Sequence, residues 1–207
     1  MNDLSEQLSA AVNSGELLES AKQNIESLLA GASSDLPMNS VEELVAAGNF
    51  AELNDRFFKT LAFGTGGLRG RTIGRTVTAA EQAAGGPNDR PEFPCVGTAT
   101  MNYYNLSRAV RGLIAYVKEF SGKGRKPSFA FAHDTRHFSK DFADFCARVC
   151  ADLGCDAYVF DGPRSTPQLS FAVRQLRCDS GVVITASHNP AHDCGFKAYF
   201  NDGAQIV

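Results

Sequence analysis

The sequence predicts an α/β domain with a mixed, largely parallel sheet that is covered by helices on both faces. The main observation is that short apolar runs alternate with amphipathic segments from residue 127 to residue 187, in the order strand, helix, strand, helix, strand. Connections of helical length make consecutive strands parallel and place the helices on the faces of the sheet. A hairpin signal, Asn201-Asp202-Gly203 between apolar runs, adds an antiparallel element at the end.

Residues 1–58 are predicted to form an N-terminal helical extension that packs on this domain. Apolar residues keep close to helical spacing over residues 3–30, where Gly15 is expected to weaken or split the helix. A second helix is expected to begin at Ser40, because Ser40 and Glu43 have the spacing of a capping box.

The domain itself is predicted to span residues 59–207. Glycines break the apolar pieces of residues 61–78, which indicates a strand, a loop and a strand, and residues 79–94 have the composition of a surface loop. A long helix is expected over residues 97–121. The alternating elements follow, with strands expected over 127–134, 155–162 and 180–187 and helices over 139–154 and 165–176.

Charge and hydropathy exclude several classes of function. The chain has a formal net charge of −3 and no basic stripe, so we expect no nucleic-acid partner. No apolar run approaches the roughly 20 residues that a membrane helix needs, and the N-terminus lacks a signal-peptide core. The sequence therefore predicts a cytoplasmic protein with no membrane partner. The chain stops inside an apparent strand at Ile206-Val207, which we interpret as a truncation.

The six cysteines are interpreted as buried small apolar residues in a reducing compartment, since none forms a C-x-x-C pair. A second interpretation concerns His188, His192 and Cys194, whose H-x3-H-x-C spacing would suit zinc. No fourth ligand with structural spacing is visible for it.

The stretch 184-ITASHNPAHDCGFKAY-199 holds the residues most suited to chemistry. Ser187 follows an apolar strand, and ligands of open α/β sheets bind beyond the carboxyl ends of the strands. The G-x-S-x-G elbow is absent, and His188, as the next residue on an extended chain, points away from Ser187. A serine hydrolase is therefore disfavoured, while a plain turn residue stays an alternative. Lys197 is either an exposed charge or an acid–base group.

The second candidate is the loop 63-FGTGGLRG-70. No helix start follows it and no G-K-[ST] is present, which rejects both the dinucleotide fingerprint and the P-loop. Its bare backbone N–H groups could approach an anion, with Arg69 supplying a charged fork. A tight structural turn is the alternative.

Together, FGTGGLRG, TASHNP, GFKAY and 133-HDTRHFS-139 resemble the α-D-phosphohexomutase family, which includes phosphoglucomutase and phosphomannomutase. The GTGGLRG loop and the NDGAQI tail are closest to the phosphoglucomutase and phosphopentomutase branch. The resemblance covers roughly residues 60 to 207, the first of the family's four domains, and implies a three-layer α/β/α fold. It implies an isomerase that moves a phosphoryl group between the 1- and 6- (or 5-) positions of a sugar phosphate.

The resemblance also implies roles for individual residues. Ser187 would be the phosphorylated serine, whose phosphate also binds Mg²⁺. Arg69 and Lys197 would flank the reacting hydroxyl, neutralise charge and share acid–base roles, and His188 would assist positioning or proton transfer. The substrate- and phosphate-binding group would comprise Thr65, Gly66, Gly67, Asn189 and Arg136.

Two departures limit what the resemblance implies. Cys194 stands where the family often has Asn, and Cys cannot donate an amide hydrogen bond. The metal loop D-G-D-G-D-R is missing, as are the sugar-recognition and phosphate loops of the later domains. We therefore expect the remaining Mg²⁺ ligands in a later domain, partners in the later domains of the same protein, a sugar bisphosphate activator, and an inactive fragment. A non-catalytic module that binds a sugar phosphate or a partner is the alternative.

Overall fold

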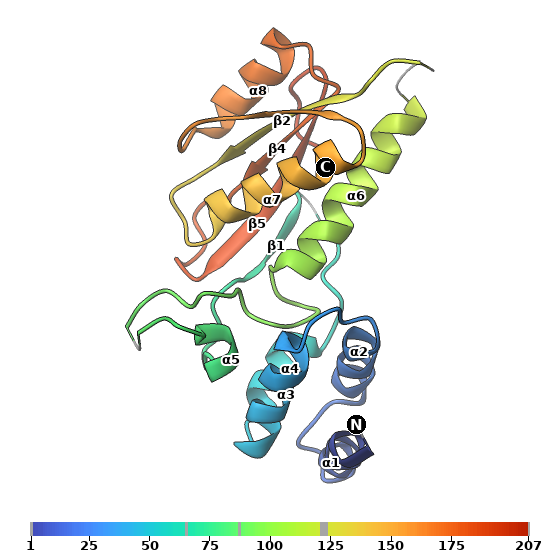
Figure 1. Ribbon diagram of the computed structural model, residues 1–207, viewed down its shortest axis with the longest axis vertical. Coiled ribbons are helices and arrows are strands. Elements are labelled where there is room, and N and C mark those ends of the chain that lie inside the picture. Colours follow the sequence, from blue (N-terminus) through green and yellow to red (C-terminus); the bar gives the residue numbers. More distant parts are fainter. Residues whose placement is uncertain (1, 65, 87, 121–123, 207) are drawn as a thin grey trace. The chain divides into compact units, whose positions relative to one another are not determined.

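The computed structural model describes residues 2–64, 66–86, 88–120 and 124–206 (Figure 1). The chain divides into two compact units. The first unit comprises Met1–Leu61 and Gly70–Asn102, and the second comprises Ala62–Arg69 and Tyr103–Val207. No helix in the described part of the chain is both long and apolar enough to cross a membrane.

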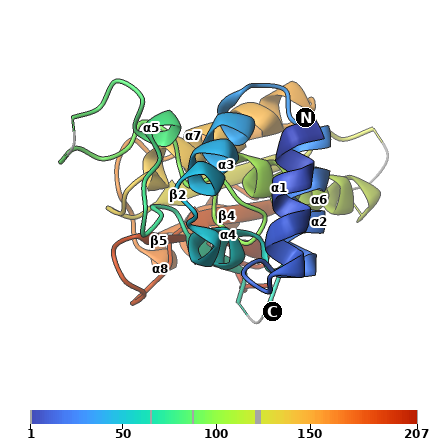
Figure 2. The same ribbon diagram turned by 90° about the horizontal axis from the view of Figure 1, so that it is seen from below.

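The first unit is helical. Its helices are α1 (Asn2–Asn13), α2 (Glu19–Ala30), α3 (Leu36–Ala46), α4 (Phe50–Phe57) and the short α5 (Ala79–Gln82). The predicted helix over 3–30 is split as expected, with Gly15 at φ +81 between α1 and α2. Figure 2 shows α1 and α2 running alongside each other. Leucine, isoleucine and valine side chains of these helices form one apolar cluster that stabilises the unit.

The predicted capping box at Ser40 is wrong. Helix α3 begins four residues earlier with a proline in its first turn, so Ser40 lies inside the helix. The buried Ser40 hydroxyl instead bonds to Thr78 Oγ1 at 3.1 Å. The capping box of this unit forms at Thr78 and Glu81 and begins α5, inside the stretch 79–94 that was predicted to be a loop. Helix α4, which Asn49 caps, was not predicted either.

The second unit contains the sheet, although two residues of β1 (Leu68–Arg71) belong to the first unit. The other strands are β2 (Ser128–His133), β3 (Asp156–Val159), β4 (Ser180–Ile184) and β5 (Asp193–Phe200), in the order β1-β5-β4-β2-β3. Strand β2 pairs parallel with β3 and β4, and β4 pairs antiparallel with β5. The prediction of a mixed, largely parallel α/β sheet is confirmed.

Helices cover this sheet on both faces. They are α6 (Tyr103–Phe120), α7 (Ser139–Asp152) and α8 (Thr166–Gln175). The crossover from β2 to β3 and the return from β3 to β4 run in opposite directions across the sheet, so right-handed connections put α7 and α8 on opposite faces. Ala130, Ala132 and Val183 pack with Leu169 and Val173 of α8. Phe129 and Phe131 alternate with those alanines and therefore face the other layer.

Several predicted elements differ in extent. The strand expected over 180–187 ends at Ile184, so Ser187 lies in the loop after it, and the strand expected over 155–162 forms only over Asp156–Val159. No strand forms over 61–63, where the glycines leave only an isolated bridge between Gly64 and Gly67. Helix α6 begins at Tyr103 rather than at residue 97. The turn at residues 201–203 forms, with the N–H of Gly203 donating to the Phe200 carbonyl at 3.0 Å, but the return is only an isolated bridge.

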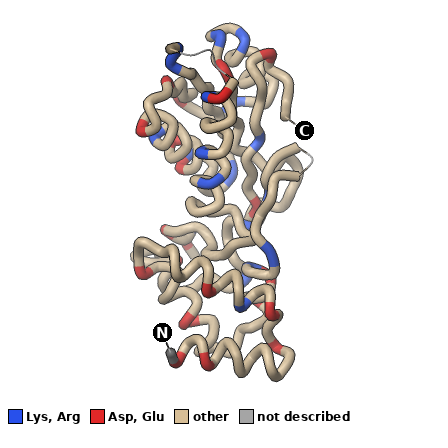
Figure 3. Tube along the Cα trace, turned by 90° about the vertical axis from the view of Figure 1, so that its right-hand side faces the viewer, with Lys and Arg blue, Asp and Glu red and all other residues tan. Residues whose placement is uncertain are grey.

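Charge is unevenly divided between the units (Figure 3). The first unit contains 13 Asp and Glu against 6 Lys and Arg, a formal charge of −7, whereas the second contains 10 against 14, a formal charge of +4. An anionic ligand is therefore attracted to the second unit rather than to the first.

Candidate active site

Ser187 and Lys197 lie in direct contact. Strand β4 ends at Ile184, three residues before Ser187, and the β4–β5 pairing places Val183 opposite Lys197. The Lys197 ammonium donates a hydrogen bond to Ser187 Oγ at 2.7 Å. Lys197 is only 8% exposed, so this cation lies largely out of water and next to a potential nucleophile.

Burial lowers the pKa of Lys197 below its ordinary value, and the positive charge of Arg69 lowers it further. A larger fraction of Lys197 is therefore neutral near pH 7 than for a lysine in water. A neutral amine can accept a proton from the hydroxyl that it contacts, and the ammonium can return it.

The glycine-rich loop brings Arg69 to this pair. Gly67 has φ +118, and a Cβ there would lie 2.3 Å from the carbonyl oxygen of Phe196. On the facing strand, a Cβ at Gly195 would lie 2.7 Å from the carbonyl oxygen of Leu68. Only glycine allows this close approach of the two backbones. Because β1 neighbours β5 in the sheet, Arg69 lies on the strand beside Lys197.

The side-chain amide of Gln205 donates to the Gly66 carbonyl at 2.8 Å, which ties the loop to the end of the chain. Gly66 has φ +88, a conformation that favours glycine. Thr65 lies outside the described residues.

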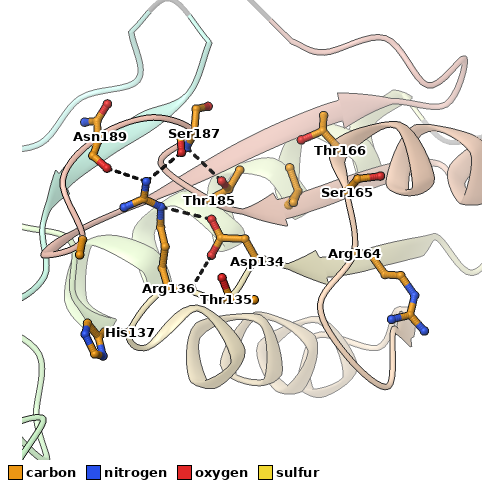
Figure 4. Close-up of a pocket in the computed structure, with 12 residues that line it drawn as sticks. Asp134, Thr135, Arg136, His137, Arg164, Ser165, Thr166, Thr185, Ser187 and Asn189 are labelled. Atoms are coloured by element: carbon orange, nitrogen blue, oxygen red, sulfur yellow. Dashed lines mark hydrogen bonds and ion pairs between the residues drawn. The ribbon is translucent and has the colours of Figure 1, made fainter.

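The loop that carries Ser187 is held from below by Arg136 (Figure 4). Ser187 has φ +55, in the left-handed region, and its N–H donates to Thr185 Oγ1 at 3.0 Å. One nitrogen of the Arg136 guanidinium donates to the carbonyls of Ser187 and Asn189 at 2.8 and 2.6 Å. The Asn189 side chain donates to Asp193 Oδ2 at 3.0 Å.

A pocket of about 550 Å³ opens beside Ser187 (Figure 4). It lies beyond the carboxyl ends of β2 and β4 and next to the beginning of α8, where ligands of open α/β sheets bind. Its lining is mostly polar and includes Asp134, Thr135, Arg136, Ser165, Thr166, Thr185, Ser187 and Asn189. Ser187 lines this pocket and also contacts Lys197 of β5.

The zinc interpretation of His188, His192 and Cys194 is contradicted. Burial raises the pKa of the Cys194 thiol to about 12, and Cys194 is fully buried while His188 is exposed. In the described part of the chain no three His, Cys, Asp or Glu residues gather in a way that could hold a metal ion. All six cysteines are free and buried, which confirms their interpretation as small apolar residues.

Two residues with contacts in the site, Thr185 and Gln205, were not predicted as site residues from the sequence. Thr185 lies within the TASHNP motif, so its polar side chain two residues before Ser187 could have been noticed as a turn acceptor. Gln205 lies within the NDGAQI tail, but that tail does not predict its contact with Gly66, which joins residues 139 positions apart.

The fold and the site define an α/β/α domain with a serine and two cations at the carboxyl edge of its sheet. Residues 95–207 match the family model described as phosphoglucomutase/phosphomannomutase, alpha/beta/alpha domain I. The chain belongs to the phosphoglucomutase/phosphomannomutase family, and the resemblance found in its sequence is confirmed.

Curated relatives agree with this family. The chain is 36% identical over 150 residues to a phosphoglucomutase of Staphylococcus haemolyticus (strain JCSC1435), a match that covers 72% of this chain and 23% of the relative. It is 37% identical over 147 residues to a phosphoglucomutase of Staphylococcus epidermidis (strain ATCC 12228 / FDA PCI 1200), covering 71% of this chain and 22% of the relative. The chain thus spans less than a quarter of these relatives.

A solved structure from Thermus thermophilus, provisionally named a phosphomannomutase, is similar with a TM-score of 0.52 and 29% identity. The similarity covers 72% of this chain and 28% of that protein. It supports the three-layer α/β/α fold of the second unit.

Proposed function

We propose that this chain provides the phosphoserine domain of a phosphosugar mutase. In this proposal Ser187 carries a phosphoryl group that moves between the 1- and 6- (or 5-) positions of a sugar phosphate through a bisphosphorylated sugar. The observation that carries the proposal is the 2.7 Å contact between Lys197 Nζ and Ser187 Oγ at the carboxyl edge of the sheet. The +4 charge of the second unit suits an anionic substrate.

The first half of the reaction transfers phosphoryl from Ser187 to the sugar. A sugar hydroxyl oxygen attacks phosphorus, and the bond between phosphorus and Ser187 Oγ breaks with its electron pair going to Oγ. The Lys197 ammonium gives its proton to Oγ, and the exposed imidazole of His188 takes the proton of the sugar hydroxyl. The guanidinium of Arg69 neutralises charge on the transferring oxygens.

The second half returns a phosphoryl group to Ser187. The bisphosphorylated sugar reorients, and the Ser187 oxygen attacks its other phosphorus while the neutral Lys197 amine takes the hydroxyl proton. The sugar oxygen leaves with the proton that His188 held, and the Ser187 phosphate is restored. The lowered pKa of Lys197 suits both directions, because the group must give and take a proton at one pH.

Mg²⁺ would neutralise phosphate charge in such a reaction, but the described residues do not form a cage for it. Two carboxylates that neighbour the Ser187 loop already have partners, since Asp134 pairs with Arg136 and Asp193 accepts from Asn189. The Ser187 phosphate would supply one oxygen ligand, and we propose that the remaining ligands come from other domains of the complete protein.

A second candidate is a non-catalytic module that binds a sugar phosphate. The pocket of about 550 Å³ beside Ser187 favours it, because a polar pocket can bind a ligand without any phosphoryl transfer.

The experiment compares Ser187→Ala with the unchanged sequence in the protein expressed from its complete gene. Glucose 1-phosphate, Mg²⁺ and glucose 1,6-bisphosphate are supplied, and turnover and intact mass are measured. We expect Ser187→Ala to lose both turnover and the covalent phosphate, whereas Ser5→Ala, a change at an exposed serine of α1, keeps both. The 207-residue chain alone should be inactive. Turnover by Ser187→Ala would contradict the proposal, and binding of the sugar phosphate without any phosphorylation would favour the second candidate.

A further inference from the structure

We propose that Arg136 is a positioning residue, which holds the loop of Ser187 in one conformation and does not bind the substrate. The inference rests on the proposed function, in which Ser187 carries the phosphoryl group. It assigns Arg136 a different task from the phosphate binding that the sequence suggested.

Four of the five N–H donors of Arg136 form hydrogen bonds within the protein, and the fifth lies at ion-pair distance from a carboxylate. An arginine has five N–H donors and no acceptor. Four of these donors meet backbone carbonyls of a single loop, those of Ser187 at 2.8 Å, Asn189 at 2.6 Å, Pro190 at 2.7 Å and Asp193 at 3.2 Å. The fifth, on Nε, faces Asp134 Oδ2 at 3.3 Å. A substrate phosphate could bind Arg136 only by breaking these contacts.

The loop needs such a partner because its backbone is unusual. Ser187 has φ +55, a left-handed conformation that residues other than glycine rarely adopt. Conformations of this kind persist only when the surroundings over-determine them. The loop also turns several carbonyl oxygens toward one point, where their partial negative charges would repel one another. The guanidinium cation lies at that point and removes the repulsion.

Arg136 is itself fixed to the framework of the second unit. Its backbone N–H donates to Asp134 Oδ1 at 2.9 Å, and Asp134 follows directly after β2. The Ser139 hydroxyl, at the beginning of α7, donates to the Asp134 carbonyl at 3.0 Å. The side chain of Arg136 is only 13% exposed, so it has little freedom to turn toward a ligand. The guanidinium therefore holds the loop in a fixed position relative to β2 and α7.

By holding the loop, Arg136 fixes the position of the Ser187 hydroxyl relative to Lys197. Lys197 is fixed by the β4–β5 register, whereas Ser187 lies beyond the end of β4 and depends on its loop. Removing the guanidinium should let the loop move and separate Oγ from Nζ. A displacement of about 1 Å at a reacting group can cost roughly 100-fold in rate.

The test measures kcat and KM for glucose 1-phosphate in the protein from the complete gene, for Arg136→Gln, Arg136→Lys and Arg136→Ala. We expect Arg136→Gln to lower kcat on the order of 100-fold with KM unchanged, since the substrate does not contact Arg136. Arg136→Lys should be intermediate, because an ammonium cannot reach four carbonyls in a fork. Added guanidinium should partly restore kcat of Arg136→Ala. Arg148→Gln, on the exposed side of α7, is the matched control and should behave as the unchanged protein.

The outcomes separate this inference from the proposed function. A rise in KM with kcat retained would show that Arg136 binds substrate and would overturn the inference, as would Arg136→Gln with unchanged kinetics. If Arg136→Gln fails to fold in a thermal melt, Arg136→Lys and the guanidinium rescue still decide the matter, because a rescued kcat with constant KM requires a positioned loop. Activity in Ser187→Ala, measured in parallel, would instead refute the proposed function.

Discussion

Each unit contains an arginine with several donors bonded within the protein, Arg56 in the first unit and Arg136 in the second, and the two differ in what they hold. Arg56, in the first unit, is 1% exposed and pairs with the carboxylates of Glu52 at 2.8 Å and Glu81 at 2.6 Å. It also donates to the Thr76 carbonyl at 2.5 Å. Arg136, in the second unit, meets one carboxylate and four carbonyls of a single loop.

The difference suggests that Arg56 contributes mainly to the stability of its unit, whereas Arg136 contributes mainly to the conformation of one loop. Arg56 joins α4 to α5 and to the segment between them, so the helices of its unit depend on it. Arg136 joins the loop of Ser187 to a sheet that the apolar contacts of β2, β4 and α8 already stabilise. We therefore expect loss of Arg56 to unfold its unit and loss of Arg136 to leave the fold intact.

The largest effect is expected for Arg56→Met. Removing one partner of a buried ion pair leaves an uncompensated charge and costs about 3–5 kcal/mol. Here both Glu52 and Glu81 would lose their cation, and urea denaturation should show the loss in free energy of unfolding. Arg75→Met is the control, because Arg75 is 69% exposed and lies 3.8 Å from Asp55, a surface pair worth about 0–1 kcal/mol. Equal losses in the two variants would contradict the role of Arg56.

A smaller effect on stability is expected for Gly67→Ala, which tests the second unit at the glycine loop. A left-handed or strained conformation costs about 1–3 kcal/mol for a residue with a side chain. The added Cβ would also lie 2.3 Å from the Phe196 carbonyl, which should push Arg69 away from Lys197 and reduce turnover.

Gly112→Ala provides the matched control. Gly112 lies within α6 with nothing near its Cβ position, so alanine should stabilise the helix by about 0.5–1 kcal/mol. If Gly67→Ala stabilised the protein as Gly112→Ala does, the inferred close approach of the glycine loop to β5 would be contradicted.

The elements of the second unit could be predicted because their signals are local. Apolar runs, the glycine after α7 and the proline at the beginning of α8 mark the ends of successive segments. The first unit was predicted less well, since two similar capping patterns competed. Ser40 and Glu43 have the right spacing, but a helix that begins at Leu36 already encloses them, and Thr78 and Glu81 form the box instead.

The site was predicted in part. The motifs indicated Ser187, Lys197 and Arg69, but the contact of Ser187 with Lys197 depends on the antiparallel register of β4 with β5, which no single segment encodes. The sequence indicated Arg136 as part of the site, but its hydrogen-bond partners could not be predicted. Its partners are backbone carbonyls, and every residue has a carbonyl.

The smallest effect concerns the charge on Lys197. Because Arg69 contributes to lowering the pKa of Lys197, Arg69→Gln should raise that pKa toward its ordinary value, and Arg69→Lys should change it less. NMR of the lysine side chain across a pH titration measures this. An unchanged pKa in Arg69→Gln would show that burial alone causes the shift.

The sign of the accompanying stability change follows from linkage. With its pKa lowered by burial and by Arg69, folded Lys197 binds fewer protons than the unfolded chain between its folded pKa and the ordinary lysine value. Stability should therefore rise with pH through that interval and become independent of this group above it. Lys197→Met should remove this slope in denaturation curves recorded at several pH values.

The backbone at position 187 also decides which amino acid can stand there. Threonine has the same hydroxyl as serine, and on chemical grounds alone the two would be interchangeable as phosphoryl acceptors. A second substituent on Cβ, however, makes a left-handed φ of the kind seen at Ser187 a severe outlier. The conservative exchange Ser187→Thr should therefore be as damaging as losing the hydroxyl. Of the two amino acids with an aliphatic hydroxyl, the backbone conformation at this position accepts serine and not threonine.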